Sequence, residues 1–318
     1  MAKAYLGIDI GGTKCAASLA VRTGEGKKPE ILGKKKIKTG GTPDEMLRKL
    51  GNLADELLSD GGIPAPAGIG IACGGPLDAA RGWVLSPPNL PGWDAVPVCT
   101  FFRERYGAPA VLGNDADACA LAEWKFGAGA GCRNMIFLTF GTGLGAGLIL
   151  DGKLYRGANG NAGEIGHVRL RPKGPVGYGK EGSAEGFCSG GGIARLAAIR
   201  SVGNPAAEPL LRAADGDPLA FTAGMIAGMA KAGDAFCCDI YTECGEMLGE
   251  TLAVLIDLFN PERIVLGGIF MRSGELLRRG MERALRKEAL PQSLDCLQIL
   301  PAELGENIGD YAALSLVM

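Results

Sequence analysis

The stretch YLGIDIGGTKCAASLAV, residues 5–21, decides how the chain begins to fold. A strand-like run leads into Gly11 and Gly12, but the run that follows, residues 15–21, is short, small and apolar, and it stops at a turn-like segment, residues 22–30. In familiar phosphate-binding loops a helix follows the glycines, so that its N-terminus faces the anion. Here the pattern predicts a second strand. The two glycines therefore close a hairpin, and a nucleotide, if one binds, lies against that hairpin.

The same layout returns in residues 134–155, NMIFLTFGTGLGAGLILDGKLY, which also read strand, glycine turn, strand. Each hairpin is followed by further strands and helices. After the first we expect a strand at 30–40 with lysines on its exposed face, a strand at 67–73, a helix at 97–106 and a strand that runs into a helix near 115. After the second we expect helices at 190–200, 217–231 and 234–258, a strand at 263–268, a helix at 273–287, a strand at 296–300 and a C-terminal helix.

This repetition predicts an α/β protein with two similar lobes that face a nucleotide-holding cleft. We expect residues 1–117 with 303–318 to form a small N-terminal lobe, and residues 118–302 to form a larger C-terminal lobe.

The segment TPDEMLRKLGNLADELLSDGG, residues 42–62, carries the strongest helix signal. Thr42 and Glu45 have the spacing of a capping box, and Pro43 occupies the first helical position, where its missing N–H costs nothing. One apolar face follows, made by Leu47, Leu50, Ala54, Leu57 and Leu58.

Composition excludes several classes of protein. With 318 residues, 47% of them apolar, the chain is long enough for two cores, and a net charge of -2 makes nucleic acid an unexpected partner. No basic leader and no apolar run of about 18 residues is present, so we expect a soluble, cytoplasmic protein without a membrane partner. Ten irregularly spaced cysteines predict reduced, mostly buried thiols, with the adjacent Cys237 and Cys238 as packing residues.

Acidic residues follow a buried strand in GNDADA, residues 113–118. Asp115 comes at the C-terminal end of that strand, where α/β sheets place reacting groups, and Asn114 lies beside it. Asp117 precedes the helical run ACALAEWKFG and is well placed as its N-cap. One of the two carboxylates is structural, and the residues alone leave open which.

Four segments, in this order and spacing, resemble the ROK family of sugar kinases and sugar-responsive repressors: GIDIGGTK, GNDADACALAEWKFG, TFGTGLGAGLILDGKLYRGANGNAGEIGHV and IVLGG. One glycine motif alone is a weak signal, but four in register are a strong one. The resemblance covers essentially the whole chain. It implies the actin-like ATPase fold, in which two RNase H-like domains, each with a mixed five-stranded sheet and helices, hold a nucleotide between them.

The resemblance implies ATP and Mg²⁺ as cofactors. Asp9 would hold the metal directly or through water, and glycines let backbone N–H groups approach the phosphates. The implied nucleotide-binding residues are Gly11, Gly12, Thr13, Lys14, Thr142, Gly143, Gly267 and Gly268. The alternative interpretations are an ordinary hairpin whose glycines only make the turn, and a plain strand-to-helix loop at 267–268.

The resemblance also assigns the catalytic base to Asp115, which would align a sugar hydroxyl and take its proton late, so that a carboxylate of ordinary pKa suffices. The implied sugar-binding residues are Gly75, Asn89, Asn114, Asp115, Glu164, His167 and Glu185. Their carboxylates and imidazole suit several ring hydroxyls. His167 is the only histidine of the chain, and a lone histidine is more often structural than a ligand. Trp93 is expected to pack in the interior.

The sequence departs from the family at the loop where many members bind zinc through one histidine and three cysteines. Val176, Tyr178 and Ser183 stand at the three thiolate positions, and one imidazole cannot replace three thiolates. We therefore expect no structural zinc. The glycines of the loop persist, so we expect packing of Tyr178 and hydrogen bonds in place of the metal.

These observations predict an ATP-dependent kinase for O6 of glucose, a related hexose or an N-acetylhexosamine, acting as a homodimer. The alternative is a sugar-sensing protein without kinase activity. A repressor is disfavoured, because only six residues precede GIDIGGTK and leave no room for a helix-turn-helix domain.

Overall fold

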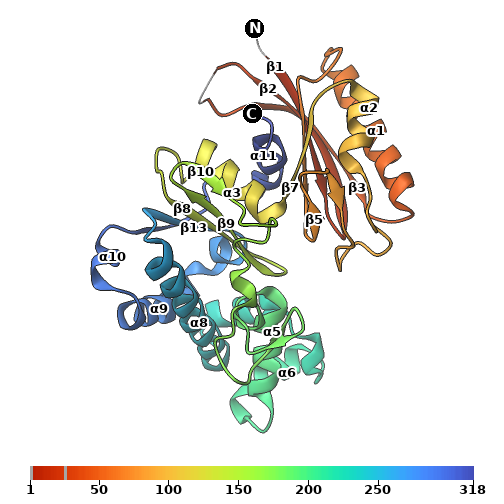
Figure 1. Ribbon diagram of the computed structural model, residues 1–318. Coiled ribbons are helices and arrows are strands. Elements are labelled where there is room, and N and C mark those ends of the chain that lie inside the picture. Colours follow the sequence, from red (N-terminus) through yellow and green to blue (C-terminus); the bar gives the residue numbers. More distant parts are fainter. Residues whose placement is uncertain (1–2, 25–26) are drawn as a thin grey trace. The chain divides into compact units, whose positions relative to one another are not determined.

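The computed structural model describes residues 3–24 and 27–318, and the chain forms two compact units (Figure 1). The first contains Met1–Arg133, Gly147–Ala162 and Glu303–Met318, and the second contains Asn134–Ala146 and Gly163–Ala302. The first unit extends beyond the expected small lobe, because residues 118–133 and 147–162 pack with it. The lobe division itself stays a prediction. The predicted turn at 22–30 includes residues 25 and 26, which lie outside the described residues.

The first sheet contains the opening hairpin. Its strands are β1 (Lys3–Ile10), β2 (Lys14–Arg22), β3 (Glu30–Lys38), β4 (Ile69–Cys73) and β7 (Ala110–Asn114), in the order β3-β2-β1-β4-β7. β1 pairs antiparallel with β2 and parallel with β4, and β4 pairs parallel with β7. A strand does follow Gly11 and Gly12, so the predicted hairpin is confirmed.

The second sheet repeats the first. Its strands are β8 (Met135–Phe140), β9 (Leu144–Leu150), β10 (Lys153–Tyr155), β13 (Arg263–Leu266) and β14 (Gln298–Pro301), in the order β10-β9-β8-β13-β14. Numbered along the chain within each sheet, both sheets have the strand order 3-2-1-4-5. The predicted α/β class and the two similar halves are therefore confirmed.

Side chains along β1 alternate between the two faces of the sheet, and each face packs against different helices of the first unit. Leu6, Ile8 and Ile10 lie in one buried cluster with the apolar face of α1 (Pro43–Asp60), whose predicted capping box between Thr42 and Glu45 is present. The alternate residue Gly7 contacts α11 (Ile308–Ser315) instead. Figure 1 shows α1 and α2 (Val98–Tyr106) on one side of this sheet and α11 on the other. Asp9, two residues after Gly7, shares the α11 side.

The second unit is mainly helical beyond its sheet. Its helices are α4 (Ala184–Phe187), α5 (Gly190–Ser201), α6 (Glu208–Ala213), α7 (Ala223–Lys231), α8 (Ala235–Phe259), α9 (Ile269–Glu288) and α10 (Pro291–Asp295). The long helices α8 and α9 pack closely, because a Cβ on Gly245 would collide with the carbonyl oxygen of Leu277. Two short hairpins complete the described chain, β5 (Leu77–Asp78) with β6 (Trp83–Val84) and β11 (Val176–Gly177) with β12 (Lys180–Glu181).

None of the ten cysteines forms a disulfide, and seven of them are buried, as expected for reduced thiols. Cys237 is buried and Cys238 half-buried inside α8, which confirms their packing role. Among the helices of residues 3–24 and 27–318, none has the length and apolar character that a membrane crossing requires.

Candidate functional site

Two carboxylates lie at the C-terminal edge of the first sheet. Because β1, β4 and β7 are parallel, their C-terminal ends meet at one edge, and Asp9 and Asp115 come near the end of β1 and directly after β7. Gly74 follows β4 between them, and the Oδ2 atom of Asp115 lies 3.9 Å from where a Cβ on Gly74 would be. The fold therefore brings both predicted carboxylates to one place.

Helix α3 (Asp115–Phe126) begins at Asp115, the residue predicted to be the catalytic base. Asn114 is its N-cap, with extended backbone and an Oδ1 atom that accepts from the N–H of Ala116 at 2.9 Å. Asp115 is the first helical residue, and its Oδ1 accepts from the same N–H at 2.8 Å. The backbone at the start of α3 therefore fixes the Oδ1 atom of Asp115.

The predicted N-cap role of Asp117 is wrong. The chain turns into the helix directly after β7, three residues earlier than the apolar run alone indicated, so Asp117 falls within the first turn. Its side chain is buried and pairs with Arg156, with Oδ2 and Nε 3.6 Å apart. Asp117 therefore has a structural partner, and the assignment of the base to Asp115 stays a prediction.

The two carboxylates have raised pKa values. The pKa of Asp9 is raised to about 6, chiefly by burial and then by the negative charge of Asp115, with a smaller contribution from Asp310, while the charges of Lys34 and Lys14 lower it. Asp115 is partly exposed to solvent, but protein atoms surround its carboxylate closely. This burial raises the pKa of Asp115, whereas hydrogen bonds from backbone N–H groups lower it. An ordinary pKa would suffice for a base that takes its proton late, and the pKa of Asp115 lies above it.

Sequence reasoning missed the pair formed by Lys34 and Asp310. The Nζ atom of Lys34 on β3 contacts the carboxylate of Asp310, which is buried in the first turn of α11. Lys35 points to the other face and pairs with Glu56 of α1, with Nζ and Oε2 2.6 Å apart. Lys36 and Lys38 of β3 are exposed as expected, whereas Lys34 and Lys35 are half-buried and paired with helices on the two sides of the sheet. The alternation of Lys34 and Lys35 was the only sequence signal of this arrangement.

Polar side chains from two further loops approach the same edge. A Cβ on Gly12 would collide with the backbone oxygen of Asn89, so the glycine of the first hairpin lets this loop pack against it. The Nδ2 atom of Asn89 lies 4.0 Å from the Cβ position of Gly74, and that of Asn114 lies 3.4 Å from the Cβ position of Gly75. Thr13 and Lys14 are exposed beside them, and Trp93 is buried as predicted. These predicted residues of the first unit therefore form one group.

Glu185 lies against the second glycine hairpin. Its Oε2 atom accepts from the N–H of Leu144 at 3.1 Å and lies 2.7 Å from the position of a Cβ on Gly143. A Cβ on Gly166 would be 3.3 Å from the Cβ of Glu185, so the short 3-10 turn η1 (Ile165–His167) lies beside it. Glu164, His167 and Thr142 are exposed.

Gly267 and Gly268 pass over the end of β8. Gly268 has a left-handed φ of 63°, and a Cβ there would collide with the carbonyl oxygen of Phe140, two residues before Thr142. These glycines have a structural reason of their own, and they also adjoin the second glycine turn. Both interpretations of the loop are therefore compatible with its geometry.

Hydrogen bonds hold the loop that carries Val176, Tyr178 and Ser183. Ser183 is buried, and its hydroxyl donates to the oxygen of Gly177 at 3.3 Å and accepts from the N–H of Gly186 at 3.1 Å. The exposed ring of Tyr178 meets the ring of His167 edge-on, with centroids 6.2 Å apart. Across the part of the chain that the structure describes, no three histidine, cysteine or acidic residues are grouped to hold a metal ion. The absence of zinc in the protein stays a prediction.

Comparisons with known proteins agree over the whole chain. A model of the ROK family matches residues 5–318. A glucokinase of Streptomyces coelicolor is 33% identical over 314 residues, covering 98% of this chain and 96% of that protein. A ROK family glucokinase from Streptomyces griseus, solved in complex with glucose and AMPPNP, is 34% identical with a TM-score of 0.78, covering 98% and 97% of the two chains. A ROK hexokinase from Thermus thermophilus is 30% identical with a TM-score of 0.80, covering 99% and 98%. With the two mixed five-stranded sheets, these matches confirm the predicted actin-like ATPase fold.

Proposed function

Because this chain belongs to the ROK family, we propose that it is an ATP-dependent sugar kinase that phosphorylates a hexose hydroxyl. The acceptor is O6 of glucose, a related hexose or an N-acetylhexosamine. Full-length similarity to glucokinases supports the reaction class. The single structural observation behind the assignment is Asp115, a carboxylate with a raised pKa at the C-terminal edge of the first sheet.

Asp115 acts as the general base. The N–H of Ala116 binds Oδ1, so Oδ2 on the side of Gly74 is left to accept the proton of the hydroxyl. A raised pKa makes the carboxylate a stronger proton acceptor, and in a loose phosphoryl-transfer transition state the proton moves late. Alignment of the hydroxyl is thus the larger part of its contribution.

Asp9 fits a magnesium ion. Mg²⁺ is usually held by one or two carboxylates together with substrate phosphates and water, and a cation would relieve the repulsion between Asp9 and Asp115. When bound, the ion neutralises charge on the phosphates of ATP. The phosphates are assigned to the glycine turns, Gly11 to Lys14 in the first unit and Thr142 with Gly143 in the second, and the adenosine to Gly267 and Gly268.

The sugar contacts fall into one group in each unit. Asn89 and Asn114, with the backbone at Gly75, supply amide groups beside Asp115, and the second unit contributes Glu164, His167 and Glu185. Side chains that both donate and accept hydrogen bonds discriminate against analogues that lack a hydroxyl. We also propose a homodimer.

A panel of sugars in a coupled ADP-release assay tests this function. We expect ATP-dependent turnover with at least one of glucose, mannose, allose, fructose and the N-acetylhexosamines, and no comparable ADP release without sugar. Calorimetric binding of a hexose without turnover would instead favour a sugar-sensing protein. The absence of both binding and turnover would contradict the proposed function.

A further inference from the structure

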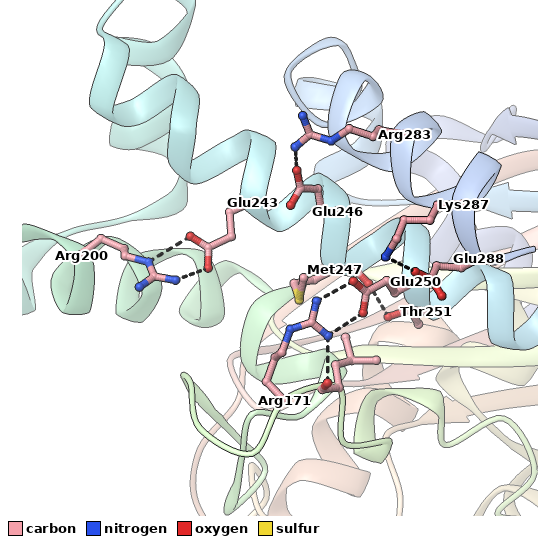
Figure 2. Close-up of polar contacts among 11 residues, drawn as sticks. Arg171, Arg200, Glu243, Glu246, Met247, Glu250, Thr251, Arg283, Lys287 and Glu288 are labelled. Atoms are coloured by element: carbon pink, nitrogen blue, oxygen red, sulfur yellow. Dashed lines mark hydrogen bonds and ion pairs between the residues drawn. The ribbon is translucent and has the colours of Figure 1, made fainter.

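Helix α8 presents a row of acidic side chains to three different segments (Figure 2). Glu243, Glu246 and Glu250 follow one another at spacings of three and four residues, which places them on one helical face. Glu243 pairs with Arg200 of α5, Glu246 with Arg283 of α9 and Glu250 with Arg171. Of these three pairs, only that of Glu250 and Arg171 joins α8 to residues 168–183. This segment lies between the proposed sugar contacts His167 and Glu185.

The pair of Arg171 and Glu250 has the two-pronged geometry of a strong ion pair. Nη1 donates to Oε2 at 2.6 Å and Nη2 to Oε1 at 2.5 Å, and Nη1 also donates to the carbonyl oxygen of Leu170 at 2.9 Å. Two parallel bonds restrict the orientation of the guanidinium as well as its distance. Both side chains are half-buried, so water competes with the pair only in part.

Backbone hydrogen bonds connect the two ends of segment 168–183. The N–H groups of Leu170 and Arg171 both donate to the oxygen of Gly182, at 2.9 and 3.1 Å, and Ala184 donates to the oxygen of Val168 at 2.8 Å. Val168 directly follows His167, and Ala184 directly precedes Glu185. The segment is therefore a closed loop whose base carries the two polar side chains.

A second contact ties the loop to His167. The Nζ atom of Lys180 on β12 donates to the backbone oxygen of His167 at 2.7 Å. This bond and the ring contact of Tyr178 link the hairpin to η1, but both lie within the loop region itself. The ion pair with Glu250 instead fixes the loop to a helix of 25 residues that packs along α9.

We propose that Arg171 and Glu250 are positioning residues of the sugar site, because their ion pair fixes segment 168–183 on α8 and thereby sets the positions of His167 and Glu185. This inference rests on the proposed function, since it assigns the same two residues to the sugar.

The test compares Arg171→Met with Arg200→Met. Arg200 provides a matched control, because it also forms a two-pronged pair with α8, at 3.0 and 2.6 Å to Glu243, but it comes from α5 and not from the loop. We expect Arg171→Met to raise the KM for the hexose about fivefold or more by displacing the polar contacts, with kcat and the KM for ATP little changed. Arg200→Met should leave the hexose KM at the wild-type value.

A charge swap and a binding measurement complete the experiment. The double variant Arg171→Glu with Glu250→Arg should recover most of the hexose affinity that Arg171→Glu alone loses. A hexose KM that is unchanged in Arg171→Met, or raised equally in Arg200→Met, would overturn the inference. Calorimetric hexose affinity of the same proteins replaces KM if the wild type binds sugar without turnover, which separates failure of the kinase assignment from failure of this inference. A wild type that binds no hexose overturns both.

Discussion

At the residue scale, the charged form of Asp9 is unfavourable at the proposed site. Burial and the neighbouring charge of Asp115 raise its pKa to about 6, while Lys34 and Lys14 only partly offset them. A folded protein gains nothing from two ionised carboxylates at one sheet edge unless a cation or a proton joins them. Their proximity is therefore better explained by function than by stability.

This electrostatic cost predicts how Asp9→Asn changes stability with pH. The folded pKa of Asp9 lies above the value of 3.8 expected for the unfolded chain, so the folded state binds the proton more tightly. The contribution of Asp9 to wild-type stability should fall as pH rises from about 4 to 6, and at pH 7 the variant should be more stable than wild type by about 1–2 kcal/mol.

Urea unfolding at pH 4 and pH 7 measures this difference. The advantage of Asp9→Asn should be largely lost near pH 4, where Asp9 is protonated in the folded state and about half protonated in the unfolded chain. An exposed control on α8, Asp239→Asn, should change the free energy of unfolding by less than about 0.5 kcal/mol at pH 7. A variant at position 9 that is less stable than wild type at pH 7 would argue against a strained carboxylate.

The choice between Asp115 and Asp117 shows how far single residues could be predicted. The sequence pattern placed both acidic residues between a strand and a helix, and only the family resemblance selected Asp115. The helix starts at Asp115 and not after Asp117, because the extended backbone of Asn114 ends β7 and its side chain caps α3. The pairing of Lys34 with Asp310 could not be predicted, because the two residues are far apart in the chain and only the packing of α11 on the sheet brings them together.

At the scale of elements, the close packing of α8 and α9 depends on small residues. A Cβ on Gly245 would collide with the carbonyl oxygen of Leu277, and backbone cannot move aside as a flexible side chain can. We expect Gly245→Ala to lower the free energy of unfolding by about 1–3 kcal/mol by forcing the helices apart.

Gly228→Ala in α7 is the matched control for this substitution. Its Cβ would meet no atom within 4 Å, and the position is exposed in a helix interior. Higher helix propensity should therefore make this variant more stable by about 0.5–1 kcal/mol. Chemical denaturation of both proteins tests the contrast, and equal stability of the two variants would refute close helix packing as the reason for Gly245.

Local signals predicted elements well where they were complete. The capping box at Thr42 and the two glycine hairpins are present as expected. The helix expected at 217–231 begins only at Ala223, because Pro218 starts a separate 3-10 turn and Thr222 caps the helix. The helix expected from 273 begins at Ile269, with a kink at Ser273 where φ is -141°. Periodicity cannot register a kink, because the apolar positions continue through it.

For the whole molecule, the strand order 3-2-1-4-5 recurs in both five-stranded sheets, and this is the strongest structural evidence for two similar halves. In each sheet the first two strands enclose a glycine turn, at Gly11 and Gly12 in one and at Thr142 and Gly143 in the other. The two hairpins share little sequence letter by letter, so their equivalence followed from layout and from the ROK resemblance. The substrate hexose lies beyond prediction, because no motif separates hexoses that differ at single hydroxyl groups.

The kinase activity of Asp115→Ala tests the central claim most directly. With the hexose identified in the sugar panel, we expect kcat to fall about 100-fold or more, since a positioned base contributes at least this much, while calorimetry shows unchanged nucleotide binding. Near-normal turnover in Asp115→Ala would remove this carboxylate from the reaction and contradict the account.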